Sequence, residues 1–487
     1  MKRMTHGEVL ILEPESDDLS RPTNYRTSPF GFMFPDLQRD DENLLENSPK
    51  TVANLRKLGE AMLDPGETTI PGIPIPAIHT FFAQFVDHDI TLEQASADIV
   101  PLDNPTQLSL EQITTLIVNS RSPNLDLDHV YGPDINGTMS PRDLTNPAKM
   151  LIHEVEPYRG LPPGKDVWND LPRLPDGTPQ IGDSRNDENI ITGQLHVAFL
   201  RAHNAIVDRA YRFDEARKLL IQHYQWLVLD DFLERVADPN IVKMIRHKGA
   251  RFFNPPARWF YMPLEFSVAA YRFGHSKVRA SYDRFNEKQN PGGLDLLFRP
   301  SRRLTDDWVI EWPSFLDPEN PARFSRPIDT SLTKKLLNLV AAQLPKHNQE
   351  PNLAIRNLLR GYILRLPTGQ AIAKAMASQG ILPMTDKQIE SVVRDIPYQI
   401  DAIKRMEKET DFLNRTPLWF YILAEAAFYN RGHHLGPVGS TIVAEVLIGV
   451  LRRSTYSILS HPQWRPTLGD TPGKFDLEDL LKLAGVF

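Results

Sequence analysis

Proline is the residue type that most restricts how this chain can fold. The 487 residues include 41 prolines, about 8% of the chain against a usual ~5%. Because proline fixes its own φ and interrupts a helix, regular elements must fit between the prolines. One that does is a helix whose apolar face is formed by Ile78, Phe81, Phe82, Phe85 and Val86. Strand-like alternation is sparse, so we expect a mainly α fold with long ordered loops and little β structure.

Further helical patterns follow the first one along the chain. Pro-rich, charged segments separate them at roughly 97–125, 133–180 and 283–330, and loops of such length inside a compact domain usually carry function. The helical patterns cover 191–213, 216–236, 264–279, 332–344, 353–364, 371–376, 386–409, 417–429 and 439–457.

Composition excludes several classes of protein. The absence of cysteine rules out disulfides, thiolate metal sites and a cysteine nucleophile. A net charge of −7 argues against a nucleic-acid binder. The longest apolar stretch, 441–451, contains Glu445 and is shorter than the ~20 residues of a membrane span. The apolar run 9–12 is too short for a Sec signal peptide, so we expect a cytoplasmic protein or one exported by a leaderless route.

A polar group interrupts the first helical pattern. Gln84, Asp87 and His88 lie close together on one side of a helix that is otherwise apolar. Burying three such groups without partners would cost several kcal/mol, at ~1–3 kcal/mol each. A ligand or cofactor is one expected partner. The alternative is a His-Asp pair that caps the helix or closes a core hydrogen-bond network.

A second segment places oxygen-bearing side chains at every other position. Ser122, Asn124, Asp126 and Asp128 alternate with other residues, so a loop could wrap their oxygens around a hard cation such as calcium. Asp89 would strengthen this site if it faced the same point. An edge strand with a solvated face would produce the same pattern.

Two further segments contain residues suited to catalysis or ligand binding. Arg185 could stabilise an anion, with Glu188 one turn beyond it, although an acidic helix start explains the same residues. His275 directly follows Gly274 on an apolar helix, where a flat ligand could approach closely. Imidazole is a common ligand for iron and zinc. A histidine satisfied within the core is the alternative.

Taken together, the four segments resemble the animal-type haem peroxidases of the peroxidase–cyclooxygenase superfamily, specifically the bacterial members. The resemblance covers roughly residues 25–455 and rests on five motifs in the family's order. These are Gln84-Phe85-x-Asp87-His88-Asp89, Asp126-x-Asp128-x-Val130-Tyr131-Gly132, Arg185-x-x-Glu188 continuing into Leu200-Arg201-Ala202-His203-Asn204, Arg272-Phe273-Gly274-His275, and Asn357-x-x-Arg360 with Pro367.

The resemblance implies a role for each residue on the distal side of a haem. His88 would be the general acid and base that moves a proton between the oxygens of peroxide. Arg185 would stabilise negative charge on the leaving oxygen. Gln84 would lie at the distal cavity, near a halide or water.

On the proximal side, the resemblance makes His275 the iron ligand. The amide of Asn357 would orient the other ring nitrogen of that histidine. Arg360, and also Arg272, would pair with the haem propionates. The basic stretch that commonly follows the family's asparagine is here Arg360-Gly361-Tyr362-Ile363-Leu364-Arg365, a departure that bears on the assignment of Asn357.

The resemblance also implies covalent links and a calcium ion. Asp87 and Glu188 match the carboxylates that form ester bonds to haem methyl groups in the family. Asn189 replaces the methionine that makes a third link in some members. The family's structural calcium ion would be held by Asp89, Ser122, Asn124, Asp126 and Asp128.

The function implied is that of a haem-dependent peroxidase. It would reduce hydrogen peroxide through a high-valent iron-oxo intermediate and oxidise a halide, a pseudohalide or a small organic donor. The chain would form one large domain of the myeloperoxidase-like type. Its parts would be an N-terminal wrapping arm (1–75), the catalytic domain (76–460) and a C-terminal tail (461–487).

Three alternatives remain at this point. Fatty-acid dioxygenases of the same superfamily use a tyrosine three residues before the proximal histidine; here Arg272 holds that position and Tyr271 precedes it. A non-enzymatic calcium- or haem-binding adhesion module would explain the loops but would not need His88, Arg185 and His275 together. A non-haem metal hydrolase is a third option, although no HExxH-like cluster is present.

Overall fold

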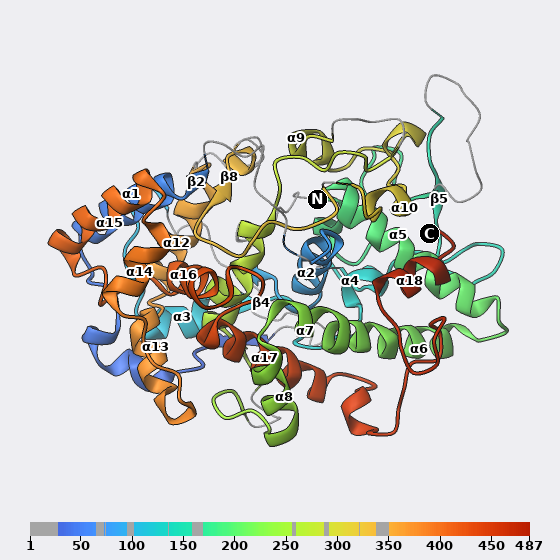
Figure 1. The fold of residues 1–487 in the computed structure, drawn as a ribbon. Helices are drawn as coiled ribbons and strands as arrows, with labels where there is room; N and C mark the ends of the chain where they lie inside the picture. Colours follow the sequence, from blue (N-terminus) through green and yellow to red (C-terminus); the bar gives the residue numbers. More distant parts are fainter. Residues whose placement is uncertain are drawn as a thin grey trace, which may run out of the picture.

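The structure is a computed structural model with helices throughout its length (Figure 1). It describes residues 28–487 apart from 65–72, 74, 95–101, 135, 158–168, 256–259, 287–291, 321 and 338–349. Part of the expected N-terminal arm, residues 1–27, and most of the helical pattern at 332–344 therefore lie outside the described residues. In the part that is described, the prediction of a mainly α fold with little β structure is confirmed.

The α-helices range from one turn to five turns in length. They are α1 (Pro49–Ala61), α2 (Ile78–Ile90), α3 (Leu110–Leu116), α4 (Asp128–Tyr131), α5 (Ile190–Val207), α6 (Phe213–Trp226), α7 (Leu233–Val236), α8 (Pro239–Lys248), α9 (Leu294–Leu297), α10 (Trp312–Phe315), α12 (Leu353–Ile363), α13 (Gly369–Ala375), α14 (Asp386–Val393), α15 (Pro397–Thr410), α16 (Leu418–Asn430), α17 (Pro437–Arg453) and α18 (Leu477–Leu483).

Other helical turns connect or extend these helices. The 3-10 helices are η1 (Pro35–Arg39), η2 (Asp41–Asn43), η5 (Ser184–Asp187), η9 (Ala270–Lys277), η10 (Asp306–Trp308), η11 (Ala377–Gln379) and η12 (Ile458–Ser460), and the π-helices are η6 (Leu227–Phe232) and η8 (Glu265–Ala269).

Short strands join segments that are far apart in the chain. They are β1 (Ser28–Gly31), β2 (Leu63–Asp64), β3 (Glu93–Gln94), β4 (Val118–Asn119), β5 (His153–Glu154), β6 (Asn169–Asp170), β7 (Met262–Pro263) and β8 (Leu332–Thr333). One sheet has the order β3-β4-β1-β7, and β2-β8 and β5-β6 are separate pairs. In the larger sheet, Ser28 lies opposite Asn119 in an antiparallel pair and Phe30 lies opposite Met262 in a parallel pair.

Helix α2 lies at the centre of the molecule (Figure 1). It packs against α5, α4, η5, η6 and η9, and all of its residues except Gln84 and Asp87 are buried. A helix that is apolar nearly all round belongs in a core. The two partly exposed positions are polar, so this helix brings polar side chains to the middle of the protein.

Three predicted helices differ from the structure. The pattern at 216–236 is divided between α6, the π-helix η6 and the short α7. The pattern at 386–409 is split into α14 and α15, because Pro397 starts a new helix at its first position. The pattern at 264–279 is not an α-helix but a π-helix, η8, followed by the 3-10 helix η9. Such irregular turns are frequent at functional sites, and η9 contains His275.

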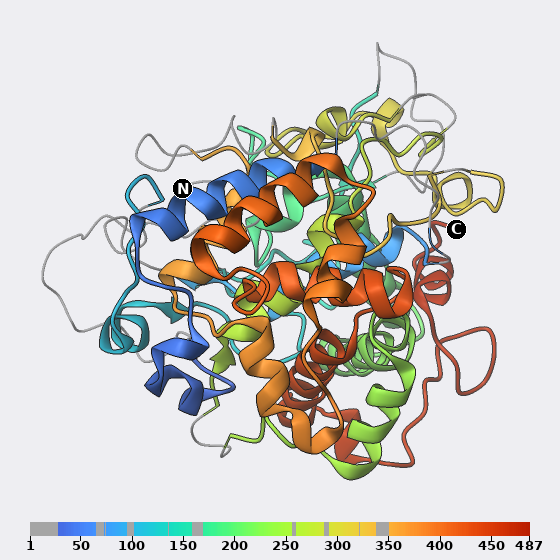
Figure 2. The ribbon, with the colours of Figure 1, turned by 60° about the vertical axis from the view of Figure 1, so that its left-hand side comes forward.

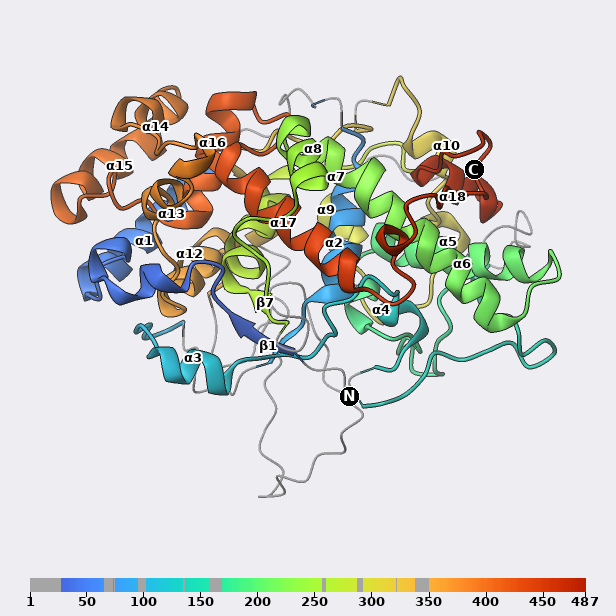
Figure 3. The same ribbon diagram turned by 90° about the horizontal axis from the view of Figure 1, so that it is seen from below.

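The segments at the two ends of the chain pack onto the helical core. Figure 2 shows α1 beside α15, a contact between regions more than 300 residues apart. Figure 3 shows α18 beside α5, where Arg201 Nε donates to the carbonyl of Ala484 at 2.6 Å. Within the described ranges, no helix has the length and apolar character needed to cross a membrane.

The buried carboxylate of Glu265 attaches the first described segment of the chain to η8. Glu265 at the start of η8 accepts hydrogen bonds from the backbone N–H groups of Met33 at 2.8 Å and Phe34 at 3.0 Å. Burial raises the pKa of the Glu265 carboxyl from its ordinary value of 4.5 to about 7, against the effect of these two donors.

This pKa predicts how stability changes with pH. Because the folded protein holds the Glu265 proton up to about pH 7 and the unfolded chain releases it near 4.5, stability is lost as the pH rises through this window. At 1.36 kcal/mol per pH unit, the loss is about 3 kcal/mol. The Glu265→Gln variant should lack this component, measured by urea unfolding at pH 4.5, 6 and 8. Identical pH slopes in the two proteins would contradict the assignment.

Candidate active site

His88 is fully buried on α2, and its ring is held by a chain of polar side chains. Its Nδ1 lies 2.8 Å from Oδ1 of Asn186, and Nδ2 of Asn186 lies 3.0 Å from Nδ1 of His196. Because the amide oxygen accepts, the hydrogen of His88 resides on Nδ1 and the lone pair on Nε2. Asn186 comes from η5 and His196 from α5, so two neighbouring elements set this tautomer.

Gln84 lies one turn before His88 and joins α2 to the start of α5. Its Nε2 donates to Oε2 of Glu188 at 3.1 Å. Its Oε1 accepts from Nδ2 of Asn189 and from the hydroxyl of Thr192, both at 3.1 Å. Asn189 is also the N-cap of α5, where its own oxygen accepts from the Thr192 N–H. The structure thus brings together Gln84 and Glu188, two residues of separate sequence motifs.

Arg185 belongs to η5 and is buried against the C-terminal end of α2. Its guanidinium group donates to the Asp183 carboxylate at 2.7 Å and to the carbonyls of His88 at 3.3 Å and Thr91 at 2.7 Å. Asp183 also pairs with Arg121 at 2.6 Å. Although burial alone would raise the pKa of Asp183, Arg185 and Arg121 hold it well below its usual range. Asp183 is therefore a buried carboxylate shared by two cations.

Asp87 lies on α2, directly before His88. The hydroxyl of Thr91 donates to its carboxylate at 2.7 Å. Its charge acts on Arg185 of η5 and on Tyr271 and Arg272 of η9. Since α2 packs directly against η9, Asp87 is near residues from both groups of motifs.

His275 is buried in η9, and its Nδ1 lies 2.7 Å from the side-chain amide of Asn357 on α12. Arg272 reaches the same amide with Nη1 at 3.4 Å from Oδ1. On the preceding residue, a methyl group in place of the Gly274 hydrogen would meet no atom within 4 Å. The predicted contact between His275 and Asn357 therefore exists, and Arg272 contacts the same amide; the glycine before the histidine has open space on its Cβ side.

Arg360 lies near this group but has a carboxylate partner. It forms a buried ion pair with Glu93 of β3. Burial, followed by the charge of Arg360, lowers the pKa of Arg272 to about 10, and Arg356 acts in the same direction. Two other arginines, Arg360 and Arg356, and two carboxylates, Asp87 and Glu93, thus act on the charge of Arg272 in a largely buried region.

The residues predicted to bind calcium make other contacts. Asp89 lies 2.8 Å from Nδ1 of His129, and Asp128 lies 3.6 Å from Arg217 and accepts from the Ser122 hydroxyl at 3.4 Å. Among the described residues, no three His, Cys, Asp or Glu side chains are grouped in a metal-binding arrangement. Asp126 and Asp128 are nevertheless buried, and Asn124 is half-buried on the same loop.

Sequence reasoning missed several residues of the site. Asn186 lies inside the Arg185-x-x-Glu188 motif and Asp183 lies two residues before it, so motif position offered a signal for both. Glu93 and His129 become partners of Arg360 and Asp89 only through the fold. His129 lies inside the quoted Asp126-x-Asp128-x-Val130 motif, so its position offered a signal, whereas no sequence pattern marks Glu93.

Comparison with known proteins identifies the family. The sequence model of the animal haem peroxidase family matches residues 104–352, which is 249 of the 487 residues. The chain belongs to this family. The matched range contains Arg185, Glu188 and His275, whereas His88 and Asn357 lie outside it.

Individual relatives are similar over part of their length. A peroxidase-like protein of Margaritifera margaritifera is 33% identical over 196 residues, covering 36% of this chain and 23% of the relative. Human lactoperoxidase is 25% identical over 225 residues, covering 40% of this chain and 30% of the relative. The chain thus spans less than a third of the length of each relative.

Solved structures share the fold over most of the chain. Peroxidase A from Dictyostelium discoideum has a TM-score of 0.62 at 16% identity and covers 90% of this chain and 89% of its own. The fatty acid alpha-dioxygenase of Arabidopsis thaliana has a TM-score of 0.55 at 13% identity and covers 85% and 71%. At these identities the likeness shows a common fold.

The shared carboxylate Asp183 provides a test of the site's stability. Asp183→Asn leaves Arg121 and Arg185 buried without their anion, so the free energy of unfolding should fall by about 3–5 kcal/mol. Urea unfolding measures this. The control is Glu215→Gln, which breaks the exposed pair with Arg212 and should leave stability nearly unchanged. Equal changes in the free energy of unfolding for the two substitutions would contradict the expectation that the buried ion pairs contribute more to stability than the exposed one.

Proposed function

We propose that this protein is a haem-dependent peroxidase that reduces hydrogen peroxide and oxidises a halide, a pseudohalide or a small organic donor. The observation that carries the proposal is the pair His88 and His275. Each is buried, and each has its Nδ1 held by a buried asparagine, Asn186 or Asn357. The two histidines come from elements that pack against each other. The names of the peroxidase relatives support the same activity.

The residues present can be matched to a haem at two places. His275 offers an imidazole whose Nδ1 faces the amide nitrogen of Asn357; with that amide turned end for end, its oxygen would accept the Nδ1 hydrogen, the usual arrangement for a metal-bound histidine. Arg272 and Arg360, which lie close enough to act on each other electrostatically, would pair with the two propionates.

Haem would supply the iron and the electrons for splitting peroxide. The protein's own contribution is proton transfer and charge stabilisation. His88, with its lone pair on Nε2, would accept a proton from peroxide and return it to the leaving oxygen. Arg185, fixed by Asp183 and two carbonyls, would stabilise negative charge on that oxygen without rearrangement. Gln84 would position a halide or water close to Glu188.

A substitution at His88 tests this mechanism. In the haem-loaded protein, His88→Gln should retain haem but lower the rate of peroxide reduction by about 10²- to 10⁴-fold, because general acid–base catalysis contributes about that factor. Stopped-flow absorbance at the Soret band measures the rate.

Two variants serve as references for that experiment. His203→Gln alters a buried histidine that bonds Tyr131 and should react like the unmodified protein. His275→Ala should lose the normal Soret spectrum, because it removes the iron ligand. A rate in His88→Gln equal to that of the unmodified protein would remove His88 from this role.

Asp87 and Glu188 are proposed to form ester bonds to two haem methyl groups. Each ester joins a carboxylate oxygen to a methyl carbon, which is oxidised by two electrons while one hydrogen peroxide is reduced to two waters. Gln84 already holds Glu188 in a fixed orientation, and Thr91 does so for Asp87. These contacts preorganise both carboxylates.

Extraction of the haem tests the ester bonds. After exposure to peroxide, acidified acetone should not remove haem from the unmodified protein. The single variants Asp87→Asn and Glu188→Gln should also keep their haem, because each still has one ester bond. The double variant should release it completely. Mass spectrometry of the protein before and after extraction gives the result. Free release from the unmodified protein would contradict the esters while leaving the peroxidase proposal intact.

A calcium ion is proposed near Asp89, Ser122, Asn124, Asp126 and Asp128. The support is the burial of three carboxylates, Asp89, Asp126 and Asp128, in one region, where Tyr224 is within electrostatic reach of the first two. Arg217 lies 3.6 Å from Asp128, and a calcium ion would bring further positive charge to this group of oxygen-bearing side chains.

Chelation tests this proposal. EGTA should lower the melting temperature of the unmodified protein by several degrees, and Asp126→Asn should abolish that response, because oxygen ligands are lost. Asp143→Asn, in an exposed turn, serves as the control and should still respond to EGTA. An unchanged melting curve with EGTA would contradict the site.

Fatty-acid dioxygenation is the second candidate function. It is favoured by the fold shared with plant alpha-dioxygenases. Against it, Arg272 holds the position three residues before His275, and Tyr271 is buried against Phe266 with ring centroids 4.7 Å apart. Oxygen uptake with palmitate in the absence of peroxide would favour the dioxygenase over the peroxidase.

A further inference from the structure

His196 of α5 contacts the far end of the amide that faces His88. His196 and Asn186 are both fully buried, and Nδ2 of Asn186 lies 3.0 Å from Nδ1 of His196. The other end of the same amide, Oδ1, lies 2.8 Å from Nδ1 of His88. Each end of the amide therefore contacts one histidine ring, and the two rings are linked through it.

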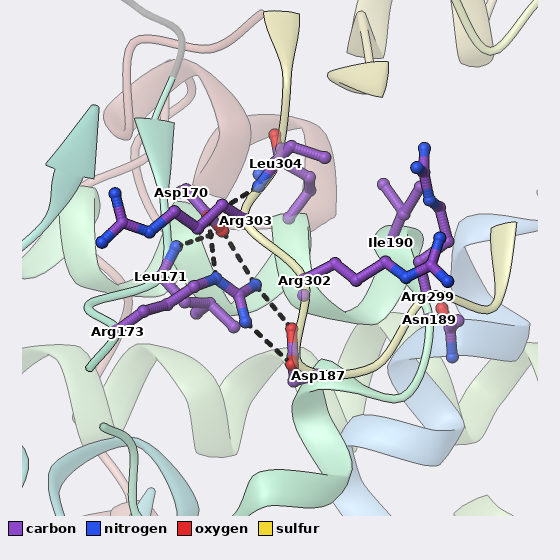
Figure 4. A pocket seen from close by; sticks show the side chains of 12 residues that line it. Asp170, Leu171, Arg173, Asp187, Asn189, Ile190, Arg299, Arg302, Arg303 and Leu304 are labelled. Carbon is purple, nitrogen blue, oxygen red and sulfur yellow. Dashed lines mark hydrogen bonds and ion pairs between the residues drawn. The ribbon is translucent and has the colours of Figure 1, made fainter. Parts of the chain in front are cut away.

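The backbone on both sides of Asn186 is fixed by buried ion pairs. Arg173 pairs with Asp187 at 2.6 Å and with Asp170 at 2.7 Å, and Figure 4 shows the bonds of its guanidinium group to both carboxylates. The ion pairs of Asp183 hold the other end of η5. Since these bonds fix η5, the freedom left to the amide of Asn186 is to turn end for end.

Asn186 and Asn357 face their histidines with opposite ends, and the group at the far end of each amide accounts for the difference. Arg272 donates to Oδ1 of Asn357 at 3.4 Å, so Nδ2 of that amide faces its histidine. At Asn186 the far group is His196, whose Nδ1 accepts from Nδ2 and leaves Oδ1 for His88. An arginine can only donate, whereas a neutral histidine can accept.

The surroundings of His196 keep its ring neutral. Burial lowers the pKa of His196 well below its ordinary value of 6.5, and the charge of His129 lowers it further, against the opposing effect of Asp183. The ring centroids of His129 and His196 are 6.4 Å apart. A protonated His196 would present an N–H group to Asn186, and the amide would have to turn round to accept it.

The orientation of this amide decides which nitrogen of His88 has the lone pair. With Oδ1 of Asn186 facing it, Nδ1 of His88 carries the hydrogen, and Nε2 can accept a proton. If the amide turned, its Nδ2 would donate to Nδ1 of His88, and the ring hydrogen would reside on Nε2. In that tautomer His88 cannot act as a base at Nε2.

We propose that His196 is a positioning residue for the reaction: by accepting from Asn186, it keeps His88 in the tautomer that can take a proton from peroxide. The inference rests on the proposed peroxidase function. His196 transfers no proton itself and acts only through Asn186. Its effect should therefore disappear when the amide of Asn186 is removed.

Nuclear magnetic resonance tests the tautomer of His88 without any turnover. The protein is labelled with ¹⁵N-histidine and loaded with zinc protoporphyrin, a diamagnetic analogue of haem, and the signals of His88 are those that vanish in His88→Gln. In the unmodified protein the ring hydrogen should reside on Nδ1. In His196→Leu, which offers no acceptor to the amide, both tautomers should be populated. His196→Phe takes the place of this variant if His196→Leu does not fold.

The rate of peroxide reduction gives a second measurement on the haem-loaded protein. His196→Leu should react about fivefold to tenfold more slowly, the factor that corresponds to one lost hydrogen bond. His196→Asn places an oxygen where Nδ1 was and should restore both the rate and the tautomer.

Phe199→Leu is the matched control on the same helix. It shortens a buried side chain that stacks on Phe85, with ring centroids 4.7 Å apart, and leaves the contacts of Asn186 in place. It should lower the melting temperature without changing the tautomer or the rate. Equal changes in Phe199→Leu and His196→Leu would overturn the proposal, because packing alone would then explain them.

A double variant shows whether His196 acts through Asn186. In the Asn186→Ala background, adding His196→Leu should change neither the tautomer of His88 nor the rate any further. A further loss of rate in that background would overturn the proposal. An unchanged tautomer in His196→Leu would overturn it as well.

Two outcomes separate this inference from the function on which it rests. If the tautomer of His88 depends on His196 but the unmodified protein does not reduce peroxide, the positioning of His88 stands and the peroxidase function is overturned. If the unmodified protein reduces peroxide and His196→Leu reacts equally fast, the peroxidase function stands and the role of His196 is overturned.

Discussion

The distal half of the site depends on one carboxylate shared by two buried cations. Asp183 binds Arg185 and Arg121, and Arg185 in turn reaches the backbone at the end of α2. These bonds fix η5 against α2. Because η5 also contains Asn186, the orientation of His88 follows from this arrangement. Charges buried in this way contribute less to net stability than to a single geometry.

The group around His275 also uses an asparagine from a neighbouring element. Oδ1 of Asn186 faces Nδ1 of His88, whereas Nδ2 of Asn357 faces Nδ1 of His275. Neutral amides suit this task, because they fix a ring without adding charge to a region that already contains several arginines. The charge of Asp87 on α2 acts on arginines of both groups, Arg185 and Arg272.

The sequence predicted the helical class and, through the resemblance to a family, that residues of separate motifs lie together. The apolar pattern around α2 is strong, and Gln84 and Glu188, or His275 and Asn357, do meet in the structure. Contacts between distant segments with no shared pattern could not be predicted. The pairing of Arg360 with Glu93 depends on a two-residue strand that has no sequence signature. The contact of Asp89 with His129 was also not predicted, because the alternating oxygen-bearing residues of the loop indicated that Asp89 would face a cation.

The small four-stranded sheet also restricts the order in which the protein can be completed during synthesis. Its strand β1, among the first residues described, pairs with β7 more than 200 residues later. Asn357 is made later still. A nascent chain that has left the ribosome only as far as α5 therefore has His88 and Arg185 but neither the closed sheet nor His275. Contacts of such long sequence separation form slowly, so the two groups of candidate residues come together only late in translation.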